Sequence, residues 1–229
     1  MPIIHDKEFG KITIRRSAKA TQVKLRVAPD GTLRASLPVY APIFLVKRLL
    51  ANSRAELREL LSDSLPDTTY EPGMRIGKSH SLYVVAGSQL EVKRQGQKII
   101  VKLPANNDIY DPIIQREIRK VAQAALRLEA KSYLPKRLKY LAENLNHNYS
   151  TIRFSHASGR WGSCSSQGTI SLNIALMKLP FELIDYVLIH ELAHTKHLNH
   201  SPAFWAEVER GDPNYVRHRR ALKRENPTI

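Results

Sequence analysis

The sequence is short of cysteine and has no long apolar run, and each absence excludes a class of protein. Cys164 is the single cysteine among 229 residues, so the chain cannot form an internal disulfide or a thiolate metal site. A metal must therefore be held by His and carboxylate side chains. No apolar stretch approaches the roughly 18 to 20 residues that span a bilayer, and the N-terminus has no basic segment followed by an apolar one. We therefore expect a cytoplasmic protein without a membrane partner.

Acidic residues are also scarce relative to basic ones. Lys and Arg number 36 against 21 Asp and Glu, a formal net charge of +15, which favours polyanions or acidic surfaces as partners. Because aromatic residues do not alternate with these charges, the excess supports only non-specific contact with nucleic acid phosphates. The candidate contact surface is one polar helix face, formed by Arg116, Arg119, Lys120 and Arg127.

Hydrophobic periodicity predicts an α+β protein. Apolar and polar residues alternate over 11–38 and 70–104, which indicates strands, with a hairpin at Pro29-Asp30-Gly31. Apolar residues at three- and four-residue steps predict one amphipathic helix over 42–62.

Further helices are expected over 111–132, from Pro135 to Leu145, from Pro180 onward and over 212–223, with short strands near 152–154 and 170–173. We place a boundary at 106–108. It separates a β-rich N-terminal region with one helix (1–107) from a mostly helical C-terminal region (108–229).

The strongest chemical signal is the pentapeptide His190-Glu191-Leu192-Ala193-His194. Two imidazoles four residues apart face the same side of a helix and can bind one zinc ion. Glu191 projects about 100° round the helix from His190, so it can reach a metal-bound water as a general base. The helix is apolar nearly all round, and burying these three polar side chains is costly unless they are paired or bound to metal.

A catalytic zinc ion needs a third protein ligand and an open position for water. His197 and His200 are the candidates. His200 is favoured because a helix ending near Leu198-Asn199 would let the chain turn back to the metal. His197 lies on the same face as His190 and His194, but one turn beyond His194.

Several further short motifs flank this pentapeptide. They are Arg160-Trp161-Gly162-Ser163-Cys164-Ser165, Ile170-Ser171-Leu172-Asn173, Leu179-Pro180, Ile184-Asp185-Tyr186-Val187, His200-Ser201 and Phe204-Trp205. Together they resemble the YgjP-like metal-dependent hydrolases, which are zincins related to the SprT-like and WLM peptidases. The resemblance is dense over 153–210. It implies that 108–229 is a minimal zincin-like catalytic domain with an HExxH helix.

The resemblance also implies roles for individual residues. His190, His194 and His200 would be metal ligands, Glu191 the general base, and 170–173 the edge strand beside the cleft, where an extended peptide could pair. Trp161 and Trp205 are expected to pack in a core or shield the site, and Cys164 is given no catalytic role. The oxyanion stabiliser stays open among Tyr215, Arg217 and His218.

These observations predict a zinc-dependent hydrolase, a metallopeptidase acting on a peptide or protein with a metal-activated water. Two alternatives remain open. One is a metal-dependent nucleotide phosphohydrolase (pyrophosphatase), suggested by the positive charge but without a phosphate-binding Gly loop. The other is a basic nucleic-acid-associated module that cleaves bound proteins or holds a structural zinc ion, with Glu207, Glu209 or His197 as a fourth ligand.

Overall fold

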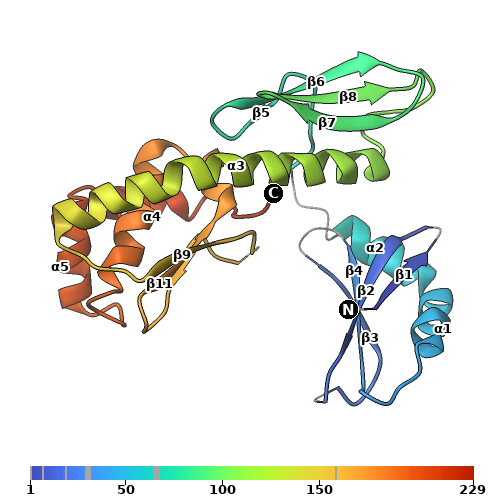
Figure 1. Ribbon diagram of the computed structural model, residues 1–229, viewed down its shortest axis with the longest axis horizontal. Coiled ribbons are helices and arrows are strands. Elements are labelled where there is room, and N and C mark those ends of the chain that lie inside the picture. The colour runs from blue at the N-terminus through green and yellow to red at the C-terminus, as the bar shows by residue number, and fades with distance from the viewer. Residues whose placement is uncertain (1, 7, 19, 29–31, 64–67, 158) are drawn as a thin grey trace. The chain divides into compact units, whose positions relative to one another are not determined.

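The computed structural model describes residues 2–6, 8–18, 20–28, 32–63, 68–157 and 159–229, except the side chains of 11, 59 and 61–63 (Figure 1). The chain folds into two compact units, Met1–Thr68 and Thr69–Ile229. Both units mix helices and strands, which confirms the α+β class. The predicted boundary at 106–108 falls inside the second unit, so the division of the chain lies earlier. A catalytic domain over 108–229 stays a prediction.

The first unit is a four-stranded sheet covered on one face by two helices. The strands are β1 (Ile3–Asp6), β2 (Gly10–Arg16), β3 (Lys24–Val27) and β4 (Leu33–Leu37), in the order β1-β2-β4-β3. β2 pairs with β4 in parallel, whereas β1 and β3 pair antiparallel with β2 and β4 respectively. The antiparallel pairing of β3 with β4 confirms the predicted hairpin, whose turn at 29–31 lies outside the described residues.

The helix predicted over 42–62 is two helices, α1 (Phe44–Asn52) and α2 (Arg54–Asp63). The prediction of one helix was wrong because Ser53 leaves helical geometry (φ −111°, ψ 23°) between them. The break lets residues of both helices, Val46 and Leu50 of α1 and Leu57 of α2, pack in one core with Ile12 and Ile14.

The second unit begins with another four-stranded sheet. Its strands are β5 (Arg75–Ile76), β6 (His80–Ala86), β7 (Glu91–Gln95) and β8 (Lys98–Leu103), in the order β5-β6-β8-β7. The buried Glu129 of the following helix accepts hydrogen bonds from the backbone N–H groups of Lys78 (2.7 Å) and Ser79 (2.9 Å). These bonds and a shared core attach the sheet to the C-terminal part of the chain.

A single 34-residue helix, α3 (Pro112–Leu145), replaces the two helices predicted on either side of Pro135. Proline removes one backbone hydrogen bond, which would go to the carbonyl of residue i−4. Here that residue, Lys131, is exposed, so water can satisfy its carbonyl group. Buried residues continue past the proline, including Leu138 and Ala142, and this packing keeps the helix continuous.

The predicted four-residue basic face of α3 was wrong for Arg119. That side chain is 2% exposed and its guanidinium lies 5.8 Å from the ring centroid of Tyr70. Lys120 is exposed and pairs with Glu117 (2.6 Å). The α3 surface therefore does not present the expected cluster of four solvated cations.

A three-stranded sheet lies next in the chain, with β9 (Thr151–Ser155), β10 (Gly162–Cys164) and β11 (Thr169–Asn173) in the order β10-β11-β9. The prediction that 170–173 forms the edge strand was wrong, because β11 pairs with β10 on one side and β9 on the other. Within the described part of the chain, the edges of this sheet are β10 and β9.

The chain ends with a short 3-10 helix, η1 (Ile174–Lys178), and the helices α4 (Phe181–Ala193), α5 (Pro202–Gly211) and α6 (Tyr215–Leu222). α4 begins after Pro180 as predicted, but ends at Ala193 rather than near Leu198-Asn199. None of the described helices has the length and apolar character needed to cross a membrane.

Candidate metal centre

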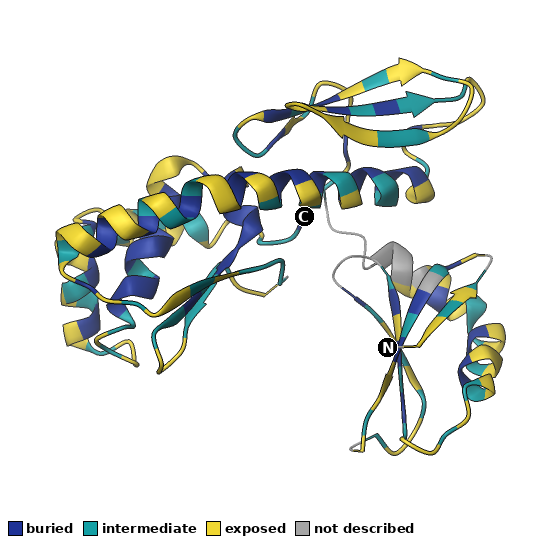
Figure 2. Ribbon diagram, in the orientation of Figure 1, coloured by how far each residue is buried: buried dark blue, intermediate teal, exposed yellow. Residues whose placement is uncertain are grey.

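Helix α4 carries the pentapeptide into the core of the second unit. Leu183, Ile184, Val187, Leu188 and Leu192 are all buried, and the helix is mostly buried in Figure 2. Apolar residues surround the helix, so it is held on several sides. This packing gives the polar side chains near its C-terminal end a rigid base.

Three imidazoles converge at the end of α4. One nitrogen each of His190, His194 and His200 lies within 4.8 Å of the other two, and the Nε2 atoms of His190 and His200 are 3.2 Å apart. Two nitrogens bound tetrahedrally to one zinc ion at about 2.0–2.1 Å would be about 3.3–3.4 Å apart. The His190–His200 pair therefore has the spacing that a single ion of this size requires, and the nitrogen of His194 lies within 4.8 Å of both.

Burial favours the neutral, metal-binding form of His190 and His194. Burial, together with His194 and His200, lowers the pKa of His190 to about 3, and burial lowers the pKa of His194. The Nδ1–H of His194 donates a hydrogen bond to the backbone carbonyl of His197 (3.0 Å). Because this bond places the ring proton on Nδ1, the unprotonated Nε2 is the atom that can bind a metal.

His197 contributes its backbone carbonyl to this arrangement, and its side chain is not among the three that converge. Glu207, considered as a fourth ligand, is engaged elsewhere: its Oε1 contacts His147 Nε2 (2.8 Å), Lys196 Nζ (2.8 Å) and Arg210. In the described residues the cluster therefore has three protein donors.

The carboxyl group of Glu191, the residue after His190 in the chain, lies in a tight space. Glu191 is 5% exposed, and burial raises its pKa to about 8. Its Oε2 has no hydrogen-bond partner among the described residues. A Cβ built on Gly162 would lie 2.6 Å from Oε1, so the backbone of β10 lies directly against this carboxyl group, and any larger residue there would displace it.

A model of the YgjP-like family, described as a metallopeptidase domain, matches residues 21–225. The chain belongs to this family. It is therefore a metal-dependent peptidase by family, and the short motifs of 153–210 that resembled the family lie within the matched range. The predicted resemblance is confirmed.

Two solved structures are similar to part of this YgjP-like chain. The metallopeptidase zymogen abylysin of Pyrococcus abyssi is 30% identical, with 39% of this chain and 92% of that chain covered and a TM-score of 0.36. The zymogen jannalysin of Methanocaldococcus jannaschii is 23% identical, with 39% and 93% covered and a TM-score of 0.35. No curated protein matched the chain.

An aromatic stack supports the third imidazole of this YgjP-like chain. His200 lies in the segment between α4 and α5, outside either helix. The ring of Trp205 stacks on His200, with centroids 5.6 Å apart and planes 23° apart, and on Tyr215, at 5.5 Å and 20°. Trp205 also packs against the core, as predicted for this residue.

Helix α6 brings to this stack a cation that was not among the predicted oxyanion stabilisers. The guanidinium of Arg219 lies 4.4 Å from the ring centroid of Trp205, although Arg219 is exposed, as is Arg217. His218 is bound to Asp212 (2.7 Å from Nδ1 to Oδ2). Of the three candidate oxyanion stabilisers, Tyr215 is thus the one that joins the stack on His200.

The side chain of Asn173 binds the segment that leads into β10. The sequence placed Asn173 at the end of a strand and did not predict this role. It is fully buried, and its Nδ2 donates to the carbonyl groups of Ala157 (2.7 Å), Arg160 (3.0 Å) and Pro227 (3.3 Å). These bonds hold the backbone immediately before Gly162, and so fix the wall against which Glu191 lies.

Proposed function

We propose that the protein is a zinc-dependent peptidase in which His190, His194 and His200 hold the metal and Glu191 is the general base. The convergence of three imidazole nitrogens carries this proposal. An all-nitrogen set of three with an open fourth position is typical of catalytic zinc. The cytoplasmic location stays a prediction.

Zinc bound there would polarise a scissile carbonyl group and acidify a water molecule. Glu191 would take the proton from the attacking water and deliver it to the leaving amine nitrogen. Two observations support this role. Oε2 of Glu191 has no protein partner among the described residues, and its pKa of about 8 suits a base that must gain and lose a proton near neutral pH.

The substrate would lie along β10. Asn173 N–H donates to the carbonyl of Trp161 (2.8 Å), and Ser165 N–H donates to the carbonyl of Thr169 (2.9 Å). Because hydrogen-bonded residues alternate along an antiparallel pair, the backbone groups of Gly162 and Cys164 point away from β11. An extended peptide can pair with these free groups, immediately beside Glu191.

The test compares Glu191→Gln with His190→Ala. We expect Glu191→Gln to keep one zinc ion per chain and to lose hydrolysis of a quenched fluorescent casein, because the carboxylate is not a ligand. His190→Ala should lose both metal and hydrolysis. Glu209→Gln is the matched control, since Glu209 is exposed, and should keep both.

Elemental analysis and the casein assay are run on the same preparations. If Glu191→Gln loses zinc as completely as His190→Ala, Glu191 is a ligand and the assigned role is wrong. If it keeps full hydrolysis, another group is the base. Hydrolysis that persists in metal-free protein would contradict the metallopeptidase proposal itself.

A further inference from the structure

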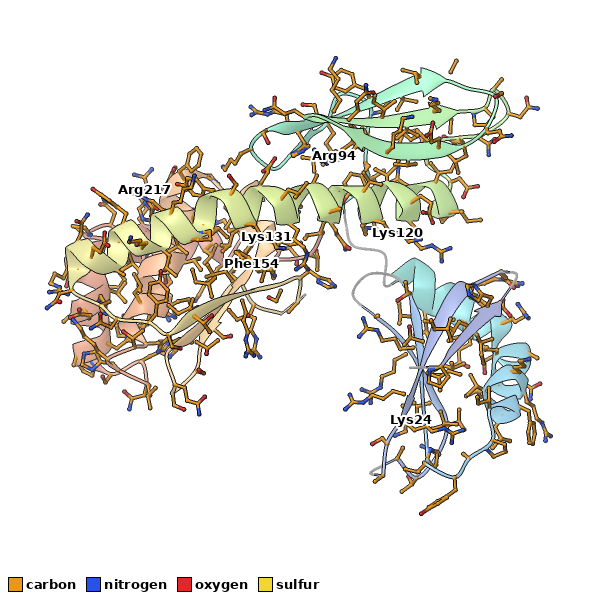
Figure 3. The ribbon with its side chains drawn as sticks, in the orientation of Figure 1. Lys24, Arg94, Lys120, Lys131, Phe154 and Arg217 are labelled. Carbon is orange, nitrogen blue, oxygen red and sulfur yellow. The ribbon has the colours of Figure 1, made fainter. Side chains whose placement is uncertain are left out.

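The sheet of the first unit has two different faces. Helices α1 and α2 cover one face, where Ile12, Ile14 and Leu37 are buried. Because side chains alternate along a strand, the intervening residues occupy the opposite face. These include Arg15 of β2, Arg34 of β4, and Lys24 and Arg26 of β3, all exposed; Figure 3 labels Lys24.

The strand register gathers these cations into two adjacent rows. Arg34 pairs directly with Arg26 on β3, and Ser36 pairs with Arg15 on one side and Lys24 on the other. Neighbouring strands are about 4.8 Å apart, and residues two apart on a strand are about 7 Å apart. Four basic residues therefore share a patch of about 10 by 7 Å.

This face is hollowed into a pocket of about 530 Å³. The described residues that line it include no acidic and no aromatic residue. Beside the four cations, its polar lining residues are Ser17, Thr21, Gln22 and Ser36. No residue of α1 or α2 is among them, so the pocket belongs to the open face of the sheet.

We propose that this pocket binds the sugar-phosphate backbone of duplex nucleic acid. Arg, Lys, Ser, Thr and Gln are the side chains that contact phosphate and sugar oxygens in such complexes, and the planar guanidinium of Arg matches phosphate geometry. The lining has no aromatic ring on which an unpaired base could stack. The contact is therefore to the backbone and independent of base sequence. This proposal replaces the predicted nucleic acid surface on α3 with one on the sheet of the first unit.

The test uses the full-length protein and two charge-matched double variants. Lys24→Gln/Arg26→Gln removes one Lys and one Arg from the pocket. Lys47→Gln/Arg48→Gln removes the same pair from exposed positions on α1, outside the pocket lining. Both variants change the net charge equally, so they separate a localised surface from general attraction. Circular dichroism establishes that both are folded.

Binding to a fluorescein-labelled 20-base-pair DNA duplex is measured by anisotropy over a range of salt concentrations. Each phosphate contact contributes about 0.9 to the slope of log K against log salt. The pocket variant should reduce the magnitude of this slope by up to about 1.8, while the α1 variant keeps the wild-type slope. Chelation of metal should leave binding unchanged, because the surface does not depend on the metal centre.

Three results would overturn the proposal. One is absence of duplex binding at low salt. Another is an equal loss in both variants, which would mean diffuse attraction by the net charge. The third is preferential binding to phosphatidylserine vesicles, with no affinity for the duplex, which would assign the surface to a membrane.

Discussion

Replacing Gly162 with alanine is the most specific perturbation of the proposed general base. The added Cβ would lie 2.6 Å from Oε1 of Glu191 and 2.8 Å from both Cδ and Cγ. Because three atoms of the side chain are involved, rotation about its last bond does not relieve the overlap. The carboxyl group must move by roughly 0.8 Å to reach the ordinary contact distance of 3.4 Å.

A displacement of this size should lower kcat/KM about 10- to 100-fold, since about 1 Å of misplacement in an active site can reduce the rate about 100-fold. The three heavy atoms nearest to the new methyl group all belong to Glu191 and none to an imidazole, so zinc should stay bound. Overpacking should also reduce the free energy of unfolding by about 1–3 kcal/mol, which lowers Tm by about 2–4 °C per kcal/mol for a protein of this size.

The assay measures casein hydrolysis, zinc content and Tm of Gly162→Ala beside Gly159→Ala. Gly159 precedes the same strand and has nothing within 4 Å of a built Cβ, so its variant should behave as the wild type. Full activity in Gly162→Ala would refute the placement of the Glu191 carboxyl group. Loss of zinc together with activity would mean that the substitution acts through the ligands instead.

Three further predictions concern the surroundings of the centre. His200→Ala should remove stoichiometric zinc, whereas His197→Ala should retain it because His197 contributes only its backbone carbonyl; elemental analysis decides. Trp205→Ala should weaken zinc binding about 10- to 100-fold by releasing His200, measured by competition with a chromogenic chelator. Burial lowers the pKa of His147 from 6.5 to about 4. The contribution of neutral His147 to the free energy of unfolding is therefore complete above pH 6.5 and is lost as the pH falls from 6.5 through 4, by on the order of 3 kcal/mol. In urea unfolding at several pH values, His147→Gln should not show this decrease.

Local patterns predicted the parts of the structure that depend on neighbouring residues. The i, i+4 spacing of His190 and His194 places both on one face of α4 in any helix, and the alternation over 23–37 was enough for the β3–β4 hairpin. The return of His200 to the same point followed from the resemblance and the spacing together.

The features that the sequence did not predict depend on packing between residues far apart in the chain. Pro135 stays inside α3 because the buried residues of the helix continue past it, and the local preference of proline to begin a helix does not predict this. β10 has three residues, too few to show a period, so its place at the sheet edge could not be read. The contact of Gly162 with Glu191 joins residues 29 positions apart, and the same Gly would fit many turns.

Helical geometry explains the remaining difference at the site. Arg217 and Arg219 are two positions apart, which places them about 200° apart around α6. Both are exposed, and it is Arg219 that lies over the ring of Trp205. The sequence shows that both are basic, but the packing of α6 on its neighbours selects which of them reaches the centre.

The central claim is a zinc ion held by three imidazoles with Glu191 beside it but not bound to it. A crystal structure of the zinc-loaded full chain, with anomalous data at the zinc edge, tests it most directly. We expect one anomalous peak with nitrogens of His190, His194 and His200 at about 2.0–2.1 Å, and a water molecule in the fourth position. A fourth protein ligand, a coordinated Glu191 carboxylate, or a peak away from these imidazoles would contradict the account.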